Sequence, residues 1–141
     1  MSKILIPVDG SDSASRALAY AVELKKQDES IELLILNVQQ PNLYSSLMEG
    51  ISTQFSMQSM LLEQGEAILA YHAQALDTHQ IEFDQSIKLG RVEDVICAQA
   101  KAEGAERIIM GRNGSHQGSY LFGSVAYPVV LGSSIPVTLI Q

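Results

Sequence analysis

The chain has 141 residues, of which 46% are hydrophobic. Because this length is typical of a domain with its own core, we expect residues 1–141 to form a single domain. Sixteen acidic residues against nine basic ones give a net charge of -7, which opposes binding to nucleic acid or to an anionic membrane surface. No apolar run approaches the roughly 20 residues that span a bilayer, and MSKILIPVDG at the start does not resemble a secretory signal, so we expect a cytoplasmic location and no membrane partner.

The first part of the chain predicts a strand followed by a helix. Residues 3–8, KILIPV, form a short apolar run that ends in a turn, as a buried strand does. The side chain of Ser11, Asp12 or Ser13 could cap the amino terminus of the helix that follows. The apolar residues of that helix recur with helical spacing at Ala14, Leu18, Ala21 and Val22.

The middle of the chain predicts a buried strand, a loop and a long helix. Residues 31–38, IELLILNV, are apolar almost throughout, as expected of a strand covered on both faces near the centre of a sheet. Residues 39–53 carry proline, glycine and several serines without clear periodicity, which indicates a loop that could act as a flap. Gly65 weakens the next helix locally. We predict an apolar stripe on that helix made of Met57, Met60, Leu61, Ile68, Tyr71 and Ala75.

The last part of the chain continues the alternation of strands and helices. Residues 81–90, IEFDQSIKLG, alternate between apolar and polar side chains, which favours a more exposed strand near a sheet edge. Cys97, the single cysteine, excludes an internal disulfide and a multi-cysteine metal site, and we expect it to pack on a helix. Pro128 should make the last helix begin late or bend at its first turn. The remaining elements are a helix at 92–100, a strand at 106–111, a helix at 125–131 and a strand at 135–140.

This order of elements predicts an α/β fold with one doubly wound, parallel, five-stranded sheet and helices on both faces. With the strand order 3-2-1-4-5, the direction of winding reverses between strands one and four, and ligands bind such sheets beyond the carboxyl ends of the strands at that point. The segments that leave these two strands are VDGSDS and GRNGSHQGSYLFGS. The second segment leads into a helix, where the backbone N–H groups of Gly123 and Ser124 could donate to an anion such as phosphate.

Several spaced motifs carry a family resemblance over nearly the whole chain. They are ILIPVDGSDSASRAL at the start, LLILNV in the second strand, LGRVEDVICAQAKAEGAERIIMGRNG in the middle, and FGSVAYPVV before IPVTLI. In this order they resemble the universal stress protein family. The resemblance implies a Rossmann-like fold, a role in the stress response and, for members with a full glycine pattern, binding of ATP or the related nucleotides AMP and ADP.

The glycine pattern of the ATP-binding members is G-x-x-G, nine residues, and then G followed by Ser or Thr. Gly111 and Gly114 match its first half, and Gly123 with Ser124 match its last, but SHQGSYLF places eight residues between the two halves. The missing residue changes the register of the N–H groups that would surround the phosphates. Arg112 could still meet a phosphate in forked geometry.

The resemblance implies the other contacts with the nucleotide as well. Pro7, Val8 and Asp9 would line the adenosine end, Val38 would pack against adenine, and Met110 would lie close to the ribose. Asp9 would hydrogen-bond the base or help to hold a metal ion such as Mg²⁺. The residues alone leave a second interpretation of Asp9 open, because aspartate in a turn commonly accepts a hydrogen bond from the backbone two residues on.

The remaining polar residues give weaker signals for function. His116 lies in a polar loop and is expected to be solvated, and His72 and His79 are predicted to lie on the surface. Glu93 and Asp94 are adjacent, so on a helix their side chains point about 100° apart and cannot form a catalytic pair. Their charge favours the amino terminus of a helix instead.

Other nucleotide-binding and signalling folds fit the sequence poorly. A dinucleotide oxidoreductase needs G-x-G-x-x-G after the first strand, where DGSDSAS has a single glycine. A P-loop NTPase needs a lysine before Ser or Thr, and no lysine follows Lys101. The S-G-G-x-D-S loop of the ATP pyrophosphatases is matched only in its last four positions, Gly10 to Ser13, and of the acidic and lysine set of a phosphoreceiver domain only Asp9 is present.

An alternative function from another class is a dimeric interaction module that binds no nucleotide. The terminal strand at 135–140, IPVTLI, would expose unpaired backbone groups at a sheet edge. Pairing with a second copy across a two-fold axis removes them, so we predict a homodimer. Because no activated nucleophile, base and orienting group occur together, we expect at most slow ATP hydrolysis rather than efficient catalysis.

Overall fold

The computed structural model describes residues 2–41, 54–113 and 124–141. The segment 42–53 within the expected flap, and Gly114, His116 and Gly123 of the glycine-rich segment, lie outside the described residues. Within the described residues, strands and helices alternate as the sequence predicts. They are β1 (Lys3–Pro7), α1 (Asp12–Gln27), β2 (Glu32–Gln39), α3 (Gln54–Thr78), β3 (Asp84–Leu89), α4 (Val92–Ala102), β4 (Arg107–Gly111), α5 (Ala126–Gly132) and β5 (Val137–Ile140).

The strands form a five-stranded sheet in the order β3-β2-β1-β4-β5. All neighbouring strands are parallel, with Lys3 paired to Glu32 between β1 and β2 and Ile108 paired to Val137 between β4 and β5. The predicted order 3-2-1-4-5 is confirmed, as is the place of the third strand at an edge. The reversal of winding therefore lies between β1 and β4.

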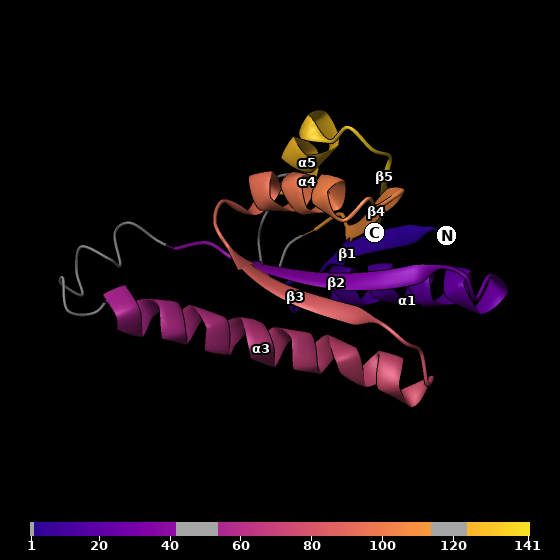
Figure 1. Cartoon of the computed structure of the whole chain (residues 1–141), viewed down its shortest axis with the longest axis horizontal. Helices are drawn as coiled ribbons and strands as arrows, with labels where there is room; N and C mark the ends of the chain where they lie inside the picture. Colours follow the sequence, from indigo (N-terminus) through magenta and orange to yellow (C-terminus); the bar gives the residue numbers. More distant parts are fainter. Residues whose placement is uncertain (1, 42–53, 114–123) are drawn as a thin grey trace.

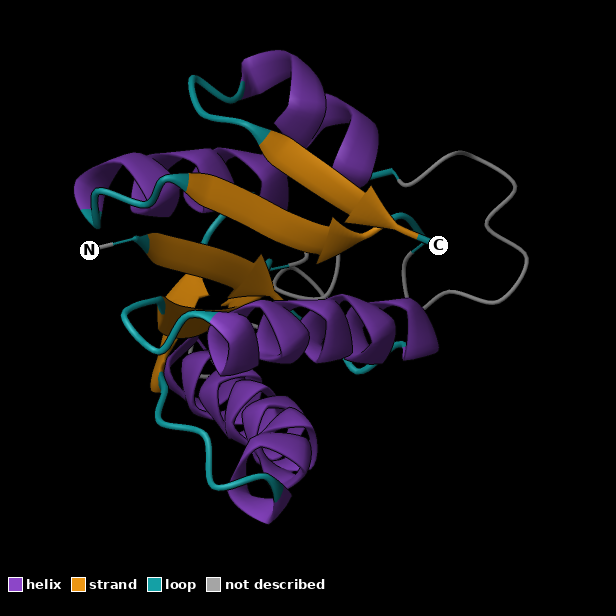
Figure 2. Ribbon diagram, turned by 90° about the vertical axis from the view of Figure 1, so that its right-hand side faces the viewer, coloured by secondary structure: helices purple, strands orange, loops and turns teal. Residues whose placement is uncertain are grey.

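Helices cover both faces of the sheet (Figure 1), and a hydrophobic core lies on each face. One core lies under α1 and α3, and the other lies under α4 and α5. Figure 2 shows the same helices and strands turned by 90°. Successive residues of β1 divide between the two cores, since Ile4 and Ile6 join the first core and Leu5 joins the second. Alternate side chains of a strand point to opposite faces, so a sheet covered on both sides needs the nearly continuous apolar runs seen in β1 and β2.

The amino terminus of α1 is capped by Ser11, one of the three expected caps. Its Oγ accepts a hydrogen bond from the N–H of Ala14 at 3.0 Å, which satisfies one of the first helical N–H groups. The cap fixes the point at which the chain leaves the loop after β1 and enters the helix.

The predicted apolar stripe on α3 is partly wrong. Met57 is buried, but Met60 and Tyr71 are 44% and 52% exposed, while Leu69, His72 and Leu76 face the core. Gly65 explains why a different face of the helix is buried from the one predicted, because a Cβ there would lie 2.9 Å from Asn37 Oδ1 and 3.0 Å from Ile87 Cγ2. The glycine lets the helix backbone pack directly on the sheet, which turns residues 65, 69, 72 and 76 inward.

The last helix begins at Ala126 and spans seven residues. Pro128 is therefore its third residue, where a backbone N–H has no partner within the helix in any case. The prediction of a late start is confirmed.

Cys97 of α4 packs against α5, with Sγ 3.9 Å from the carbonyl oxygen of Val129, and burial raises the pKa of its thiol. In the part of the chain that the structure describes, no helix has both the length and the apolar character needed to cross a bilayer.

Candidate functional site

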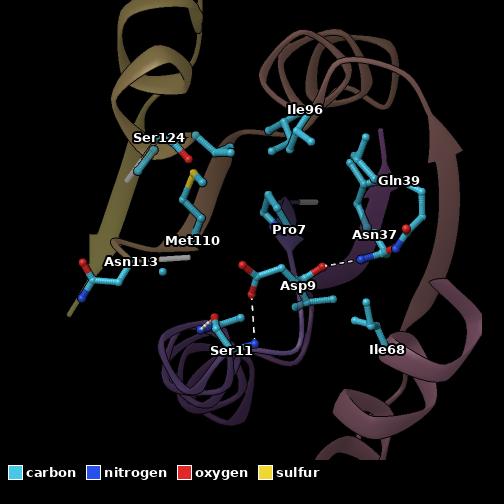
Figure 3. Close-up of a pocket in the computed structure, with 18 of the residues that line it drawn as sticks. Pro7, Asp9, Ser11, Asn37, Gln39, Ile68, Ile96, Met110, Asn113 and Ser124 are labelled. Atoms are coloured by element: carbon cyan, nitrogen blue, oxygen red, sulfur yellow. Dashed lines mark hydrogen bonds between the residues drawn. The ribbon is translucent and has the colours of Figure 1, made fainter. Parts of the chain in front are cut away.

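A pocket of about 480 Å³ opens where β1 and β4 end (Figure 3). This is the place that the topology predicts for a ligand, and the volume is within the range of about 300 to 1,000 Å³ found for small-molecule sites. Eight of the residues proposed from the sequence line it, namely Pro7, Val8, Asp9, Val38, Met110, Gly111, Arg112 and Ser124. The structure thus brings together all the proposed site residues that it describes.

The apolar part of the pocket contains side chains that were not predicted from the sequence as site residues. Ile68 of α3 lies on one side and Ile96 of α4 on another, with Pro7 between them at the end of β1 (Figure 3). Val92 and Leu36 also line this part. No local motif marks these residues, because they come from elements far apart in the sequence that border the same pocket only in the folded chain.

Asp9 takes part in the turn that precedes α1. Its Oδ1 accepts a hydrogen bond from the N–H of Ser11 at 3.0 Å, as the second interpretation of this residue predicted. The same side chain is exposed and lines the pocket. The turn and a ligand contact are therefore compatible, since a carboxylate can accept several hydrogen bonds.

Asn37 is a buried polar residue that the sequence analysis missed. Its Nδ2 donates to the carbonyl oxygen of Val8 at 2.8 Å, and its Oδ1 accepts from Nε2 of Gln39 at 2.8 Å. A polar side chain within the apolar run LLILNV was the available signal, because a buried amide needs partners. Asn37 thereby ties the end of β1 to β2 beside the pocket (Figure 3).

The prediction that His72 lies on the surface is wrong. The residue is only 2% exposed, and its Nε2 accepts a hydrogen bond from the backbone N–H of Gly10 at 3.0 Å. His72 follows Leu69 by three residues and precedes Leu76 by four, a spacing that places it on their face of the helix. That spacing was the missed signal. His79, near the end of α3, is exposed as predicted.

Burial makes His72 a source of acid sensitivity for the fold. Burial lowers the pKa of its imidazole, and the charge of Asp9 opposes this only in part. The pKa in the folded state is below the unfolded value of about 6.5. The contribution of the neutral His72 to the free energy of unfolding is therefore fully present above that pH and is lost as the pH falls below it. Urea unfolding at pH 7.5 and pH 5.0 should show a larger loss for the wild-type protein than for His72→Gln. Equal losses would contradict this assignment.

Gly111, the last residue of β4, allows β4 and α1 to approach closely. A Cβ there would lie 2.3 Å from Ser13 Oγ and 2.7 Å from the carbonyl carbon of Ser13. The Ser13 hydroxyl also donates to the carbonyl oxygen of Ile140 at 3.2 Å and accepts from the N–H of Asn113 at 3.3 Å. One hydroxyl group thus joins α1, β5 and the chain just beyond β4, so this glycine has a packing role as well as its place in the pocket.

The segment after β4 brings Arg112 to the pocket. Its backbone N–H donates to the carbonyl oxygen of Ile140 at 2.7 Å, and the residue is among those that line the pocket. Ser124 also lines the pocket, two residues before α5. The late start of α5 moves the first turn of the helix away from Ser124, so the expected alignment of Gly123 and Ser124 with the start of the helix is not found for Ser124.

The described residues offer few metal ligands. Among them, no three or more His, Cys, Asp or Glu side chains lie together as a metal site would require, and Asp9 alone of the described lining residues carries a carboxylate. Glu93 and Asp94 lie in the first turn of α4, as predicted, and Glu93 forms an ion pair with Arg91 at 2.6 Å.

Comparison with known proteins gives the family. The model of the universal stress protein family matches residues 1–141. The chain belongs to the universal stress protein family. Universal stress protein YxiE of Bacillus subtilis is 27% identical over 99% of both chains. A universal stress protein of Thermus aquaticus is 31% identical, over 98% of this chain and 97% of its own.

Several solved structures have the same fold. The protein MJ0577 superposes with a TM-score of 0.83 at 26% identity, covering 99% of this chain and 94% of its own. An Archaeoglobus fulgidus universal stress protein in complex with dAMP gives a TM-score of 0.75 at 19% identity, covering 100% and 98%. An Arabidopsis thaliana family member with AMP bound gives 0.71 at 20% identity, covering 99% and 91%, and a further universal stress protein was solved in complex with cAMP. Adenine nucleotides are therefore ligands within this family.

Proposed function

We propose that this universal stress protein binds an adenine nucleotide in the pocket at the ends of β1 and β4 and acts as a cytoplasmic, dimeric regulatory module in the stress response. The observation that carries the proposal is the gathering of eight sequence-proposed residues around one pocket of about 480 Å³. The relatives of the same fold that hold AMP, dAMP or cAMP support it.

The pocket offers different surroundings to the two ends of a nucleotide. Apolar side chains, including Val38, Ile68 and Ile96, form a surface suited to the flat adenine ring. Arg112 and Ser124 provide donors on the side of β4 and α5, where a phosphate can be bound by charge-assisted hydrogen bonds. The arrangement favours a base near β2 and phosphates near the segment after β4.

Asp9 suits a metal ion that arrives with the nucleotide. Mg²⁺ commonly binds through one or two carboxylates together with phosphate oxygens and water, and the one carboxylate among the described lining residues fits that pattern. Such an ion would neutralise phosphate charge beside a protein whose net charge is -7. We assign Asp9 this role for ATP with Mg²⁺, with hydrolysis at most slow.

The second candidate is a dimeric interaction module of the same fold without a nucleotide. The observation that favours it is the spacing of eight residues between Gly114 and Gly123. One residue fewer than the family pattern changes which backbone N–H groups can converge on a phosphate. The two candidates differ in one measurable property, the affinity for AMP and ATP.

Calorimetric titration of the purified protein with AMP, and with ATP and Mg²⁺, tests the proposal. We expect binding in the wild-type protein and at least about tenfold weaker binding in Val38→Glu. The half-buried Val38 lines the pocket, and a carboxylate there would meet the base in an apolar environment without a partner, which costs more than 1.4 kcal/mol.

Val130→Glu is the matched control, because it makes the same substitution at a residue of α5 that is 42% exposed and lies outside the lining. It changes the net charge equally and should bind like the wild-type protein. A denatured sample should also be assayed for nucleotide that co-purifies. No binding up to about 1 mM and no carried nucleotide would decide for the interaction module.

A further inference from the structure

The loop between β1 and α1 borders the pocket, and other elements hold its backbone in place. The N–H of Val8 donates to the carbonyl oxygen of Leu36 at 2.8 Å, and the carbonyl oxygen of Val8 accepts from Asn37. These two contacts come from β2. The next contact along the loop comes from α3, where Nε2 of His72 accepts the N–H of Gly10 at 3.0 Å.

The chemistry of this contact determines the form of the histidine. A backbone N–H can only donate, so Nε2 must accept, and the imidazole is then neutral with its proton on Nδ1. Gly10 has a φ of +87°, a conformation that residues with a side chain rarely adopt. The hydrogen bond therefore lies where the chain turns sharply.

The position of Gly10 gives the contact a consequence for the pocket. Its N–H belongs to the planar peptide unit that follows Asp9, so holding the N–H fixes the orientation of that unit. Asp9 is exposed and lines the pocket, whereas His72 is 2% exposed and is not among the lining residues. His72 thus acts on the pocket through the loop rather than by contact with a ligand.

We propose that His72 is a positioning residue for the nucleotide pocket, which accepts the Gly10 N–H and so fixes the direction in which Asp9 meets the ligand. The inference rests on the proposed function, because nucleotide binding is what the orientation of Asp9 serves. The helix α3 then contributes to the pocket in two ways. Gln64 and Ile68 line it directly, and His72 acts through the loop before α1.

Three variants test whether an acceptor at this position is needed. His72→Gln keeps an acceptor, because the side-chain oxygen of glutamine reaches about as far as Nε2. His72→Leu fills the space without an acceptor, and His79→Leu makes the same change at an exposed histidine in the turn just after α3. Loss of one hydrogen bond should weaken AMP binding about five- to tenfold in His72→Leu. His72→Gln should retain affinity within about twofold, and His79→Leu should match the wild-type protein.

A second measurement examines the loop without a ligand. Exchange of the Gly10 amide hydrogen, followed by NMR, should be about tenfold faster in His72→Leu than in the wild-type protein, and His72→Gln should restore protection. Thermal unfolding shows whether each variant is folded at the temperature used. Amide exchange separates loss of the contact to Gly10 from a general loss of packing, because amides elsewhere in the sheet should keep their protection.

The outcomes distinguish the positioning role of His72 from the proposed binding of a nucleotide. Equal AMP affinity in all variants would overturn the positioning role and leave the proposed function standing. Equally weak binding by His72→Gln and His72→Leu, with the fold intact, would also overturn it, since the acceptor would then be irrelevant. Absence of AMP binding by the wild-type protein would overturn the proposed function and the binding role of His72 with it, and the Gly10 exchange would still decide whether the hydrogen bond forms.

Discussion

Gly111→Ala is expected to destabilise the protein by about 3 kcal/mol, the upper part of the usual range for overpacking a core. The added Cβ would lie 2.3 Å from Ser13 Oγ, 2.7 Å from the carbonyl carbon of Ser13 and 2.9 Å from the N atom of Ala14. Two of these atoms belong to the backbone at the start of α1, so no change of side-chain rotamer relieves the overlap. The helix must move away from β4.

Urea unfolding of the variant measures this loss as a change in the free energy of unfolding. Gly132→Ala is the matched control, because the nearest atom to its added Cβ is Cys97 Sγ at an ordinary 3.7 Å. Since Gly132 is the last residue of α5, alanine there should leave stability unchanged or raise it by up to about 1 kcal/mol. Similar small effects of both substitutions would mean that β4 and α1 are not packed as closely as the structure shows.

The topology could be predicted from the sequence because it depends on patterns that repeat along the chain. Apolar runs of strand length alternate with helical stripes, and right-handed crossovers then leave few arrangements. The same logic located the pocket, since it follows from where the winding reverses. The late start of α5 was also predictable, because Pro128 acts through its own backbone.

The errors concern residues whose surroundings are set by contacts between elements. The buried face of α3 depends on the close approach of Gly65 to Asn37 and Ile87, which no periodicity in the helix reveals. Because the face that carries Gly65 packs on the sheet, His72 faces the core and Met60 faces solvent. A glycine in the middle of a long helix was a sign of close packing as well as of local weakness.

The role of Gly111 shows a similar limit. The family pattern gives this glycine a place in a phosphate-binding loop, and the structure adds that α1 leaves no room for a side chain there. Both demands select glycine, so the sequence alone could not separate them. Only the distances to Ser13 reveal the packing demand.

The wild-type protein is expected to be a dimer with twice the chain mass of 15.3 kDa, joined through β5. This strand pairs with β4 on one side and forms the edge of the sheet on the other. Pro136 and Ile140 direct their carbonyl oxygens toward β4, where they accept from the N–H groups of Ile108 and Arg112 at 2.9 and 2.7 Å. Because this direction alternates along a strand, Val137 and Leu139 direct their backbone groups to the free edge.

Val137→Pro should convert the dimer to a monomer, because proline removes one outward N–H from each copy, and a symmetric pairing of β5 strands loses both hydrogen bonds. Proline is compatible with an edge strand, so the fold should survive. Val137→Ala is the control, since it shortens the side chain and keeps the N–H, and it should stay dimeric. Light scattering after gel filtration measures the mass of each. A wild-type mass of one chain would contradict the dimer itself. A Val137→Pro dimer as stable as the Val137→Ala dimer would exclude pairing through this edge. The dimer contact would then have to lie on another surface, such as the exposed side chains of Tyr127 and Leu131.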